Sequence, residues 1–270
     1  MVHRGPGERA VNALRLAFGT LTVLPVRAPV VDRRTAGRAM VLAPLVGLVL
    51  AVLALAAAGA VRATSEGAPL LAAVVAVAAL ALLTRGMHLD GLADTVDGLG
   101  SGRPAEGALE VMRKGDVGPF GVVALVLALL LQVAAVDRLL DEPDGALLVT
   151  VCLVLSRLAL PALCSVGVPA ARPGGLGATV AGTVTRGALA LSVGLAAVLV
   201  VLAAALVVVT TDATGAGPAA GHLAAVVVAP SVVTALLGVH CVRRLGGITG
   251  DVLGAGVETT LTVALVIAAL

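Results

Sequence analysis

The sequence has almost no aromatic residues: its 270 residues include two phenylalanines, no tryptophan and no tyrosine. Membrane proteins usually carry tryptophan and tyrosine where they meet the lipid headgroups, so the common aromatic belt is missing here. Charge is also sparse, because only 13% of the residues are Asp, Glu, Lys or Arg. Hydrophobic residues make up 59% of the chain, and the mean hydropathy is +1.11. This excess over the needs of a soluble core indicates transmembrane helices built from Ala, Val and Leu.

Cysteine is scarce, and its placement argues against two kinds of structural site. Cys152, Cys164 and Cys241 each lie in an apolar segment, without a C-x-x-C pair or a zinc-type spacing. We therefore expect neither a disulfide framework nor a structural zinc ion, and we interpret the three thiols as small buried side chains. The first forty residues also lack the pattern of a cleaved signal peptide.

Six apolar runs approach the ~20 residues that a helix needs to cross a bilayer. They cover residues 40–61, 68–84, 120–136, 146–166, 188–210 and 223–242. The run 68–84 and a final apolar tail, 259–270, are short, so we expect either to tilt little or to re-enter. Residues 9–26 are amphipathic and predict an interfacial helix, with Arg15 and Arg27 toward lipid phosphates. The sequence thus predicts an all-α, polytopic integral membrane protein of about 6–7 transmembrane helices, forming one domain over residues 1–270.

The arginines predict the orientation of these helices, because positive residues favour the cytoplasmic side. The predicted cytoplasmic or interfacial segment 1–39 holds seven: Arg4, Arg9, Arg15, Arg27, Arg33, Arg34 and Arg38. Alternation then places residues 85–118, 167–187 and 243–258 on the same side. We expect the first of these to be a catalytic loop or helix and the last a Gly-rich loop. The prediction is a multi-pass protein of the cell membrane whose site faces the cytoplasm.

The segment HLDGLADTVDG, residues 88–98, places three carboxylates within this apolar sequence. Asp90, Asp94 and Asp97 are spaced i, i+4 and i+7, so on a helix they fall within an arc of roughly 60°. Three like charges repel one another, and Mg²⁺ would relieve that repulsion while bridging a substrate phosphate. The spacing predicts a Mg²⁺ site, with solvated or helix-capping aspartates as the alternative. For His88 we consider a buried or interfacial side chain and, as the alternative, a base or ligand.

A second charged segment, LEVMRKGDVGPFG, covers residues 109–121. Arg113, Lys114 and Asp116 lie just before a predicted span. A guanidinium binds phosphate oxygens bidentately and an ammonium acts as a point charge, so this loop suits a diphosphate. The alternative is the ordinary positive flank of a membrane helix.

A third segment, RLGGITGDVLGAGVE, covers residues 244–258. Its candidate binding residues are Gly246, Gly247, Thr249, Asp251 and Glu258. We expect residues 246–251 to form a backbone cradle that closes over the same cavity as the aspartates and brings Asp251 near them. The alternative is a flexible turn in which Asp251 caps the final helix.

These groups together indicate metal-assisted phosphoryl transfer at one membrane face. Arg157 is a lone cation inside an apolar run, so it must meet a carboxylate, a carbonyl or an anionic substrate. The residue types alone do not name the substrates.

The ordered motifs resemble the cobalamin synthases, the adenosylcobinamide-GDP ribazoletransferases of coenzyme B12 synthesis. The likeness runs through FGTLTVLPV (18–26), MVLAPLVGLVL (40–50), HLDGLADTVDG, LEVMRKGDVGPFG, Ser156-Arg157, PGGLGA (173–178) and LGGITGDVLGAGVE (245–258). The pattern HLDGLADT-x-DG is highly specific, and the ordered set is more specific still.

The resemblance implies a Mg²⁺-dependent membrane transferase. It would join adenosylcobinamide-GDP to α-ribazole, or to its 5′-phosphate, and release GMP. By this resemblance Asp90, Asp94 and Asp97 hold metal and diphosphate, while Arg113, Lys114 and Arg157 take phosphate charge. One segment departs from the family: where many members read M-[KR]-D-[SP]-R-x-G, residues 112–118 read MRKGDVG. The acid and base of this loop are thus exchanged in position, while its overall charge chemistry is kept.

Two other classes fit parts of the sequence. A CDP-alcohol phosphotransferase would use a similar aspartate array, but its D-G-x-x-A-R continuation is missing, since Leu99, Gly100 and Ser101 follow Gly98. A small cation-coupled transporter would carry polar groups deep in several spans, whereas the charges here gather at one face. The expected partners are the two small substrates and the lipid bilayer, with no nucleic acid; the sequence leaves the oligomeric state open.

Overall fold

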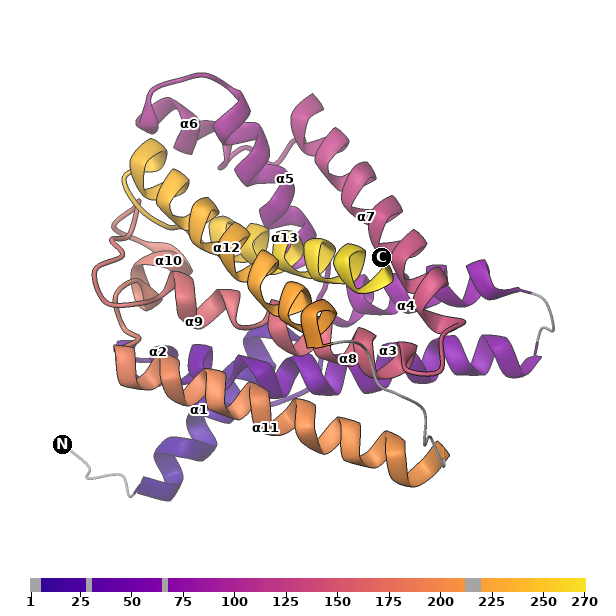
Figure 1. Ribbon diagram of the computed structural model, residues 1–270. Helices are drawn as coiled ribbons and strands as arrows, with labels where there is room; N and C mark the ends of the chain where they lie inside the picture. The colour runs from indigo at the N-terminus through magenta and orange to yellow at the C-terminus, as the bar shows by residue number, and fades with distance from the viewer. Residues whose placement is uncertain (1–5, 28–30, 65–67, 212–219) are drawn as a thin grey trace.

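The computed structural model describes residues 6–27, 31–64, 68–211 and 220–270, and in these the only elements longer than an isolated bridge are helices (Figure 1). This confirms the predicted all-α fold. The helices are α1 (Pro6–Leu21), α2 (Arg33–Val41), α3 (Ala43–Thr64), α4 (Pro69–Leu83), α5 (Met87–Gly100), α6 (Ala105–Val111), α7 (Pro119–Leu140), α8 (Gly145–Ser156), α9 (Ala159–Leu163), α10 (Gly175–Val180), α11 (Arg186–Thr211), α12 (Ala220–Leu245) and α13 (Gly250–Ala269).

Six helical stretches in the described residues are long and apolar enough to cross a membrane. They are α3, α7, the joined α8 and α9, α11, α12 and α13. The short α4 passes only together with α5, from which it is bent by 85°, so this pair forms either a broken span or a re-entrant segment. The count of six, or seven with the pair, agrees with the predicted range.

The C-terminal region differs from the prediction of a loop over 243–258 followed by a short apolar tail. Residues 243–245 end α12, and residues 250–258 already belong to α13, which is long enough to be a span. The glycines that suggested a loop instead allow close helix packing: a Cβ on Gly254 would lie 3.1 Å from the Cα of His88 in α5. Small residues commonly serve this purpose where membrane helices meet.

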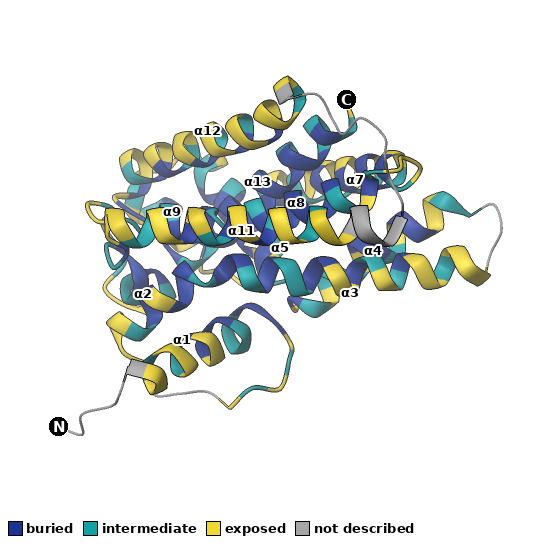
Figure 2. Cartoon of the chain, turned by 60° about the horizontal axis from the view of Figure 1, so that its bottom comes forward, coloured by how far each residue is buried: buried dark blue, intermediate teal, exposed yellow. Residues whose placement is uncertain are grey.

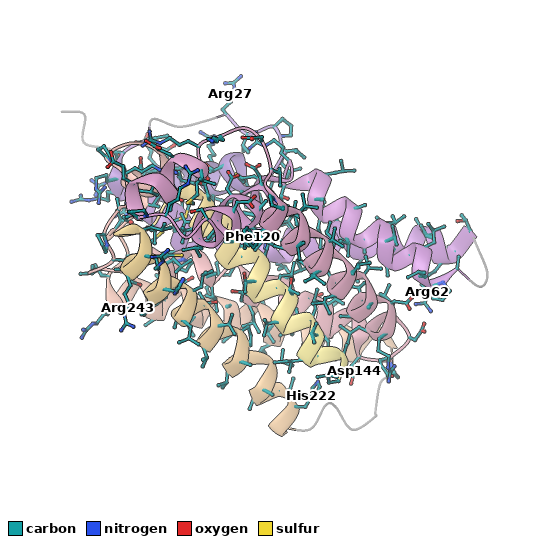
Figure 3. The ribbon with its side chains drawn as sticks, turned by 90° about the horizontal axis from the view of Figure 1, so that it is seen from above. Arg27, Arg62, Phe120, Asp144, His222 and Arg243 are labelled. Carbon is teal, nitrogen blue, oxygen red and sulfur yellow. The ribbon has the colours of Figure 1, made fainter. Side chains whose placement is uncertain are left out.

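The connections between helices gather at two ends of the bundle. In Figure 1, α6, α10 and the junction of α12 with α13 lie at one end, whereas the last turns of α3 and α11 extend to the other. Figure 3 shows the same separation for charged side chains, with Arg243 at the first end and Arg62 and Asp144 at the second. The segments predicted to share a side therefore lie at one end, while their cytoplasmic placement stays a prediction.

The core is built around α13. About 72% of its span is buried, against 17% for α11 and 22% for α12, so α13 is an inner helix and the other two are outer ones. Figure 2 shows these outer helices striped with exposed residues. Between their ends these helices expose large apolar side chains, such as Leu202 and Leu236, which suits a lipid-facing surface.

The N-terminal part forms a smaller layer beside the bundle. The amphipathic α1 buries Ala13, Leu16 and Ala17 and packs on α2. It covers residues 6–21 where the sequence predicted a helix over 9–26, and its interfacial location stays a prediction. Asp32 caps α2 by accepting a 2.8 Å hydrogen bond from the Thr35 amide. The segment after α1 then reaches the α4–α5 bend, where the Val23 amide donates to the Leu83 carbonyl at 2.8 Å.

Candidate active site where α5 meets α13

Helices α5 and α13 are in backbone contact, because each of them has a glycine that faces the backbone of the other. A Cβ on Gly91 would lie 2.6 Å from the Asp251 carbonyl oxygen, and Gly254 packs against His88. Since the later residue of α13 meets the earlier residue of α5, the two helices run antiparallel. The contact places Asp251 beside Gly91, in the interval between Asp90 and Asp94.

The carboxylates of Asp90, Asp94 and Asp251 consequently lie together at one edge of the protein, which we call the rim. Asp90 is exposed and Asp94 half-buried. Asp94 is repelled by Asp90 and Asp251, and Asp251 is repelled by Asp90. Such a cluster attracts cations, because a positive charge relieves several repulsions at once.

Asp97, the last of the three aspartates predicted to share one face of the helix, makes different contacts from Asp90 and Asp94. Its carboxylate accepts hydrogen bonds from the amides of Gly118 at 2.7 Å and Gly121 at 2.9 Å, and the side chain is only 7% exposed. These amides lie at the N-cap of α7 (Gly118) and in its first turn (Gly121), where a helix presents unsatisfied N–H groups and a partial positive charge. Asp97 therefore joins α5 to α7 by capping α7 from another helix.

The three-aspartate metal set is not preassembled in the described residues, where no group of three Asp, Glu, His or Cys side chains is arranged to hold a metal ion. Mg²⁺ does not require such a cage, since it commonly binds through one or two carboxylates and completes its shell with water and substrate phosphates. Asp90, Asp94 and Asp251 fit that pattern better than the predicted set with Asp97.

Arg172 supplies a positive charge to this rim. Its Nη1 lies 4.0 Å from Asp251 Oδ2, and its Nη2 donates a 2.9 Å hydrogen bond to the Leu109 carbonyl at the end of α6. Burial lowers the pKa of Arg172 from its usual value, and the nearby Asp251 acts in the opposite direction. Arg172 was not among the site residues predicted from the sequence; its place directly before the PGGLGA segment is the signal that could have singled it out.

Residues 246–249 form a short link rather than an open cradle. The Ile248 amide donates to the Pro169 carbonyl at 2.9 Å, and the Ala171 amide donates to Ile248 at 3.0 Å. Gly247 lies so close to this strand-like pairing that a Cβ there would overlap the Pro169 carbonyl. Gly246 adopts a φ of +80°, which favours glycine. These contacts fix the start of α13 relative to residues 169–171, and thereby Asp251 relative to Arg172.

Thr249 connects this link to the carboxylate. Its hydroxyl accepts a 3.2 Å hydrogen bond from the Val252 amide, as an N-cap of α13, and donates at 3.1 Å to Asp251 Oδ2. Asp251 is thus held in the first turn of α13 by Thr249, which itself caps the helix. The cap alternative considered for Asp251 belongs to Thr249 instead.

The loop that holds Arg113, Lys114 and Asp116 lies exposed between α6 and α7. Arg113 is close enough to Arg172 to disfavour its charge, so at least this cation lies near the rim. The two arginines repel each other and would both be stabilised by an anion between them.

Arg157, Glu258 and His88 lie inside the bundle and not at the rim. Arg157 is 2% and Glu258 7% exposed, and the two charges attract each other. Gln132 Nε2 donates to Glu258 at 2.9 Å, and Arg157 Nη1 donates to Ser156 at 2.8 Å. Arg157 and Glu258 also line a cavity of about 10 Å³, the size of one water position.

This burial does not agree with the predicted phosphate-binding roles of Arg157 and Glu258. Asp251 and Glu258 do share α13, but seven residues of helix separate them by about 10 Å along the axis. His88 is 2% exposed, and neither ring nitrogen has a hydrogen-bond partner in the described structure. It therefore matches the buried alternative rather than a base at the rim.

Comparison with known proteins identifies the family. The profile of the family described as cobalamin-5-phosphate synthase (CobS) matches residues 13–269. A protein of Frankia casuarinae named adenosylcobinamide-GDP ribazoletransferase is 44% identical over 265 residues, covering 95% of this chain and 94% of its own length. A protein of the same name from Nocardioides sp. is 44% identical, with 94% and 96% covered. The one from Pseudomonas aeruginosa is 36% identical, with 97% and 100% covered.

No solved structure matches this chain. The profile, however, spans nearly all of the sequence, including the aspartates of α5, Arg172 and the start of α13. The chain belongs to the cobalamin-5-phosphate synthase family.

Proposed function

We propose that this protein joins adenosylcobinamide-GDP to α-ribazole, or to α-ribazole 5′-phosphate, and releases GMP. The product is then adenosylcobalamin or its 5′-phosphate. Membership of the family and the shared name of its relatives support the reaction. The structural observation that carries it is the meeting of Asp90, Asp94 and Asp251 with Arg172 at one rim.

The chemistry of this reaction suits the charges at the rim. A ribazole hydroxyl oxygen forms a bond to the phosphorus next to cobinamide, the bond from that phosphorus to GMP breaks, and the hydroxyl proton passes to a carboxylate. Arg172 and Arg113 would bind diphosphate oxygens and stabilise the departing phosphate.

Mg²⁺ is the cofactor we propose, with Asp90 and Asp94 as its main protein ligands and Asp251 beside them. When bound, it would offset the diphosphate charge and the repulsion among the carboxylates. Asp97 keeps α5 in place through its bonds to α7, so its contribution is positioning. We also propose that this rim faces the cytoplasm, because the arginine distribution favours that side.

A GMP-release assay tests the proposal directly. The full-length protein in lipid nanodiscs should release GMP only when both substrates and Mg²⁺ are present, and chelation by EDTA should stop the reaction reversibly. Ribazole-independent GMP release would indicate a hydrolase, and turnover unaffected by chelation would contradict the metal proposal. CMP release from a CDP-alcohol under the same conditions would instead favour the phosphotransferase alternative.

A further inference from the structure

A cavity of about 410 Å³ lies between α1, α2 and the first turns of α11, away from the candidate active site. Figure 2 shows these three helices next to one another at the N-terminal side of the bundle. Its lining includes Arg9 and Ala13 from α1, Arg38 and Val41 from α2, and Ala188 and Leu191 from α11. Two cationic side chains from different helices thus line a pocket that is otherwise apolar.

The walls of this pocket are fixed by specific contacts. The Ser192 hydroxyl donates a 2.8 Å hydrogen bond to the Val41 carbonyl, which ties α11 to the end of α2. Arg33, at the start of α2, donates to the carbonyls of Ala178 and Ala181. The pocket is therefore built between anchored helices, and α1 covers it.

The lining is complementary to the two chemical parts of a membrane phospholipid, its phosphate and its acyl chains. Guanidinium groups bind phosphate oxygens, and the apolar walls offer a path for an acyl chain. No carboxylate lines the cavity among the described residues. On α11, a membrane-spanning helix, Leu191 is 67% exposed, so the apolar side of the pocket opens toward lipid.

A second cavity, of about 470 Å³, lies beside α9, α11 and α12, but its lining includes only one cation, Arg243. A single exposed arginine at a helix end is what any positive flank provides. The pairing of Arg9 with Arg38 is the more specific arrangement, because two helices must be in register to place both charges at one opening.

We propose that the pocket between α1, α2 and α11 binds one anionic membrane phospholipid. Its phosphate lies at Arg9 and Arg38, and an acyl chain follows Ala188 and Leu191. The lipid holds α1 against the bundle. The last turn of α1 also contacts the α4–α5 bend, where Arg85 donates to the Gly19 and Thr20 carbonyls. By holding α1 in place, the lipid therefore also stabilises the position of α5.

The test compares two lipids on the full-length protein in neutral detergent. Phosphatidylglycerol is added in parallel with phosphatidylcholine of the same chains; retained lipid is counted by native mass spectrometry and the thermal unfolding midpoint is recorded. We expect one retained phosphatidylglycerol and a midpoint raised only by that lipid. The double variant Arg9→Gln/Arg38→Gln should weaken phosphatidylglycerol binding by about tenfold or more. Arg244→Gln, which removes an exposed arginine of α12, should retain full binding.

Each comparison is made within one variant, with and without lipid, so a variant of lower stability still gives a reading. Ala188→Phe fills the apolar part without changing charge and should also reduce phosphatidylglycerol binding. The proposal is overturned if phosphatidylcholine stabilises equally, if the double variant binds as the unchanged protein does, or if inorganic phosphate alone reproduces the shift. The last result would identify the site as one for a soluble anion.

Discussion

At the scale of single residues, Arg172 is the cation placed directly against the carboxylate rim. Its position depends on a hydrogen bond to Leu109 in α6 and on the nearby Asp251, so it is held from two sides. A guanidinium held in this way can contact a diphosphate without first being ordered, which saves the entropy of fixing a long side chain.

Replacing Arg172 by Gln should lower kcat/KM for GMP release by about tenfold or more, because a charged contact to phosphate is lost. Arg172→Lys should recover part of the activity, since it keeps the charge but loses the fork of donors. Steady-state kinetics with Arg244→Gln as the matched control measures this. Unchanged kinetics in Arg172→Gln would remove the residue from the site.

The carboxylates at the rim should differ from the buried ones in what they control. Asp94→Asn and Asp251→Asn keep side-chain volume while removing charge, so each should reduce turnover by at least ~10-fold, about 1.4 kcal/mol of transition-state stabilisation. The thermal unfolding midpoint in detergent should change little. Near-normal GMP release at limiting Mg²⁺ from both variants would contradict the shared cation site.

Arg157 and Glu258 should control stability instead. Arg157 and Glu258 are opposite charges buried within the bundle, so removing one leaves the other without its compensating charge. Glu258→Gln should therefore lower the unfolding midpoint strongly. The double variant Arg157→Met/Glu258→Gln should be more stable than Glu258→Gln alone. If the double variant is the less stable of the two, the charges are not coupled.

At the scale of elements, the site depends on how closely α5 approaches α13. Gly91 and Gly254 remove the side chains that would hold the helices apart, and α13 in turn is set by its link to residues 169–171. Asp97 adds a third constraint by fixing α5 to the first turn of α7. The rim is thus the place where three helices are positioned by backbone contacts.

Gly91→Ala tests this dependence. Its Cβ would lie 2.6 Å from the Asp251 carbonyl oxygen, so the helices must separate and both activity and the unfolding midpoint should fall. The matched control is Gly59→Ala in α3, where a Cβ meets nothing within 4 Å. There the higher helix propensity of Ala should leave stability equal or raise it by up to ~1 kcal/mol. Equal behaviour of the two variants would contradict the close-contact argument.

At the scale of the whole molecule, the two-ended distribution of connections predicts the topology. Ser101 follows α5, and Asp141 ends α7 at the opposite end of the bundle. Cysteines introduced one at a time at these positions, in cells probed with a membrane-impermeant thiol reagent, should be labelled from opposite sides. Labelling of both from the same side would refute the topology; labelling of Ser101 from outside would refute the cytoplasmic rim.

The sequence by itself determined the fold class and the family. Long apolar runs dictate helices in a membrane, because backbone groups there must bond within their own segment. The i, i+4, i+7 spacing placed the aspartates of α5 on one helix, and the order of the motifs along the chain indicated the family. These features are local, so a linear pattern carries them.

Tertiary structure decided which of these residues act together. Asp97 and Glu258 looked equivalent to Asp90 and Asp251 in sequence. Packing instead directs Asp97 into a helix cap and buries Glu258 inside the bundle, where it accepts a hydrogen bond from Gln132 and attracts the charge of Arg157. Arg172 entered the rim only because residues 169–171 pair with Ile248. A carboxylate's role depends on which N–H group, cation or solvent it faces, and those partners come from distant parts of the chain that only the packing of the helices brings together.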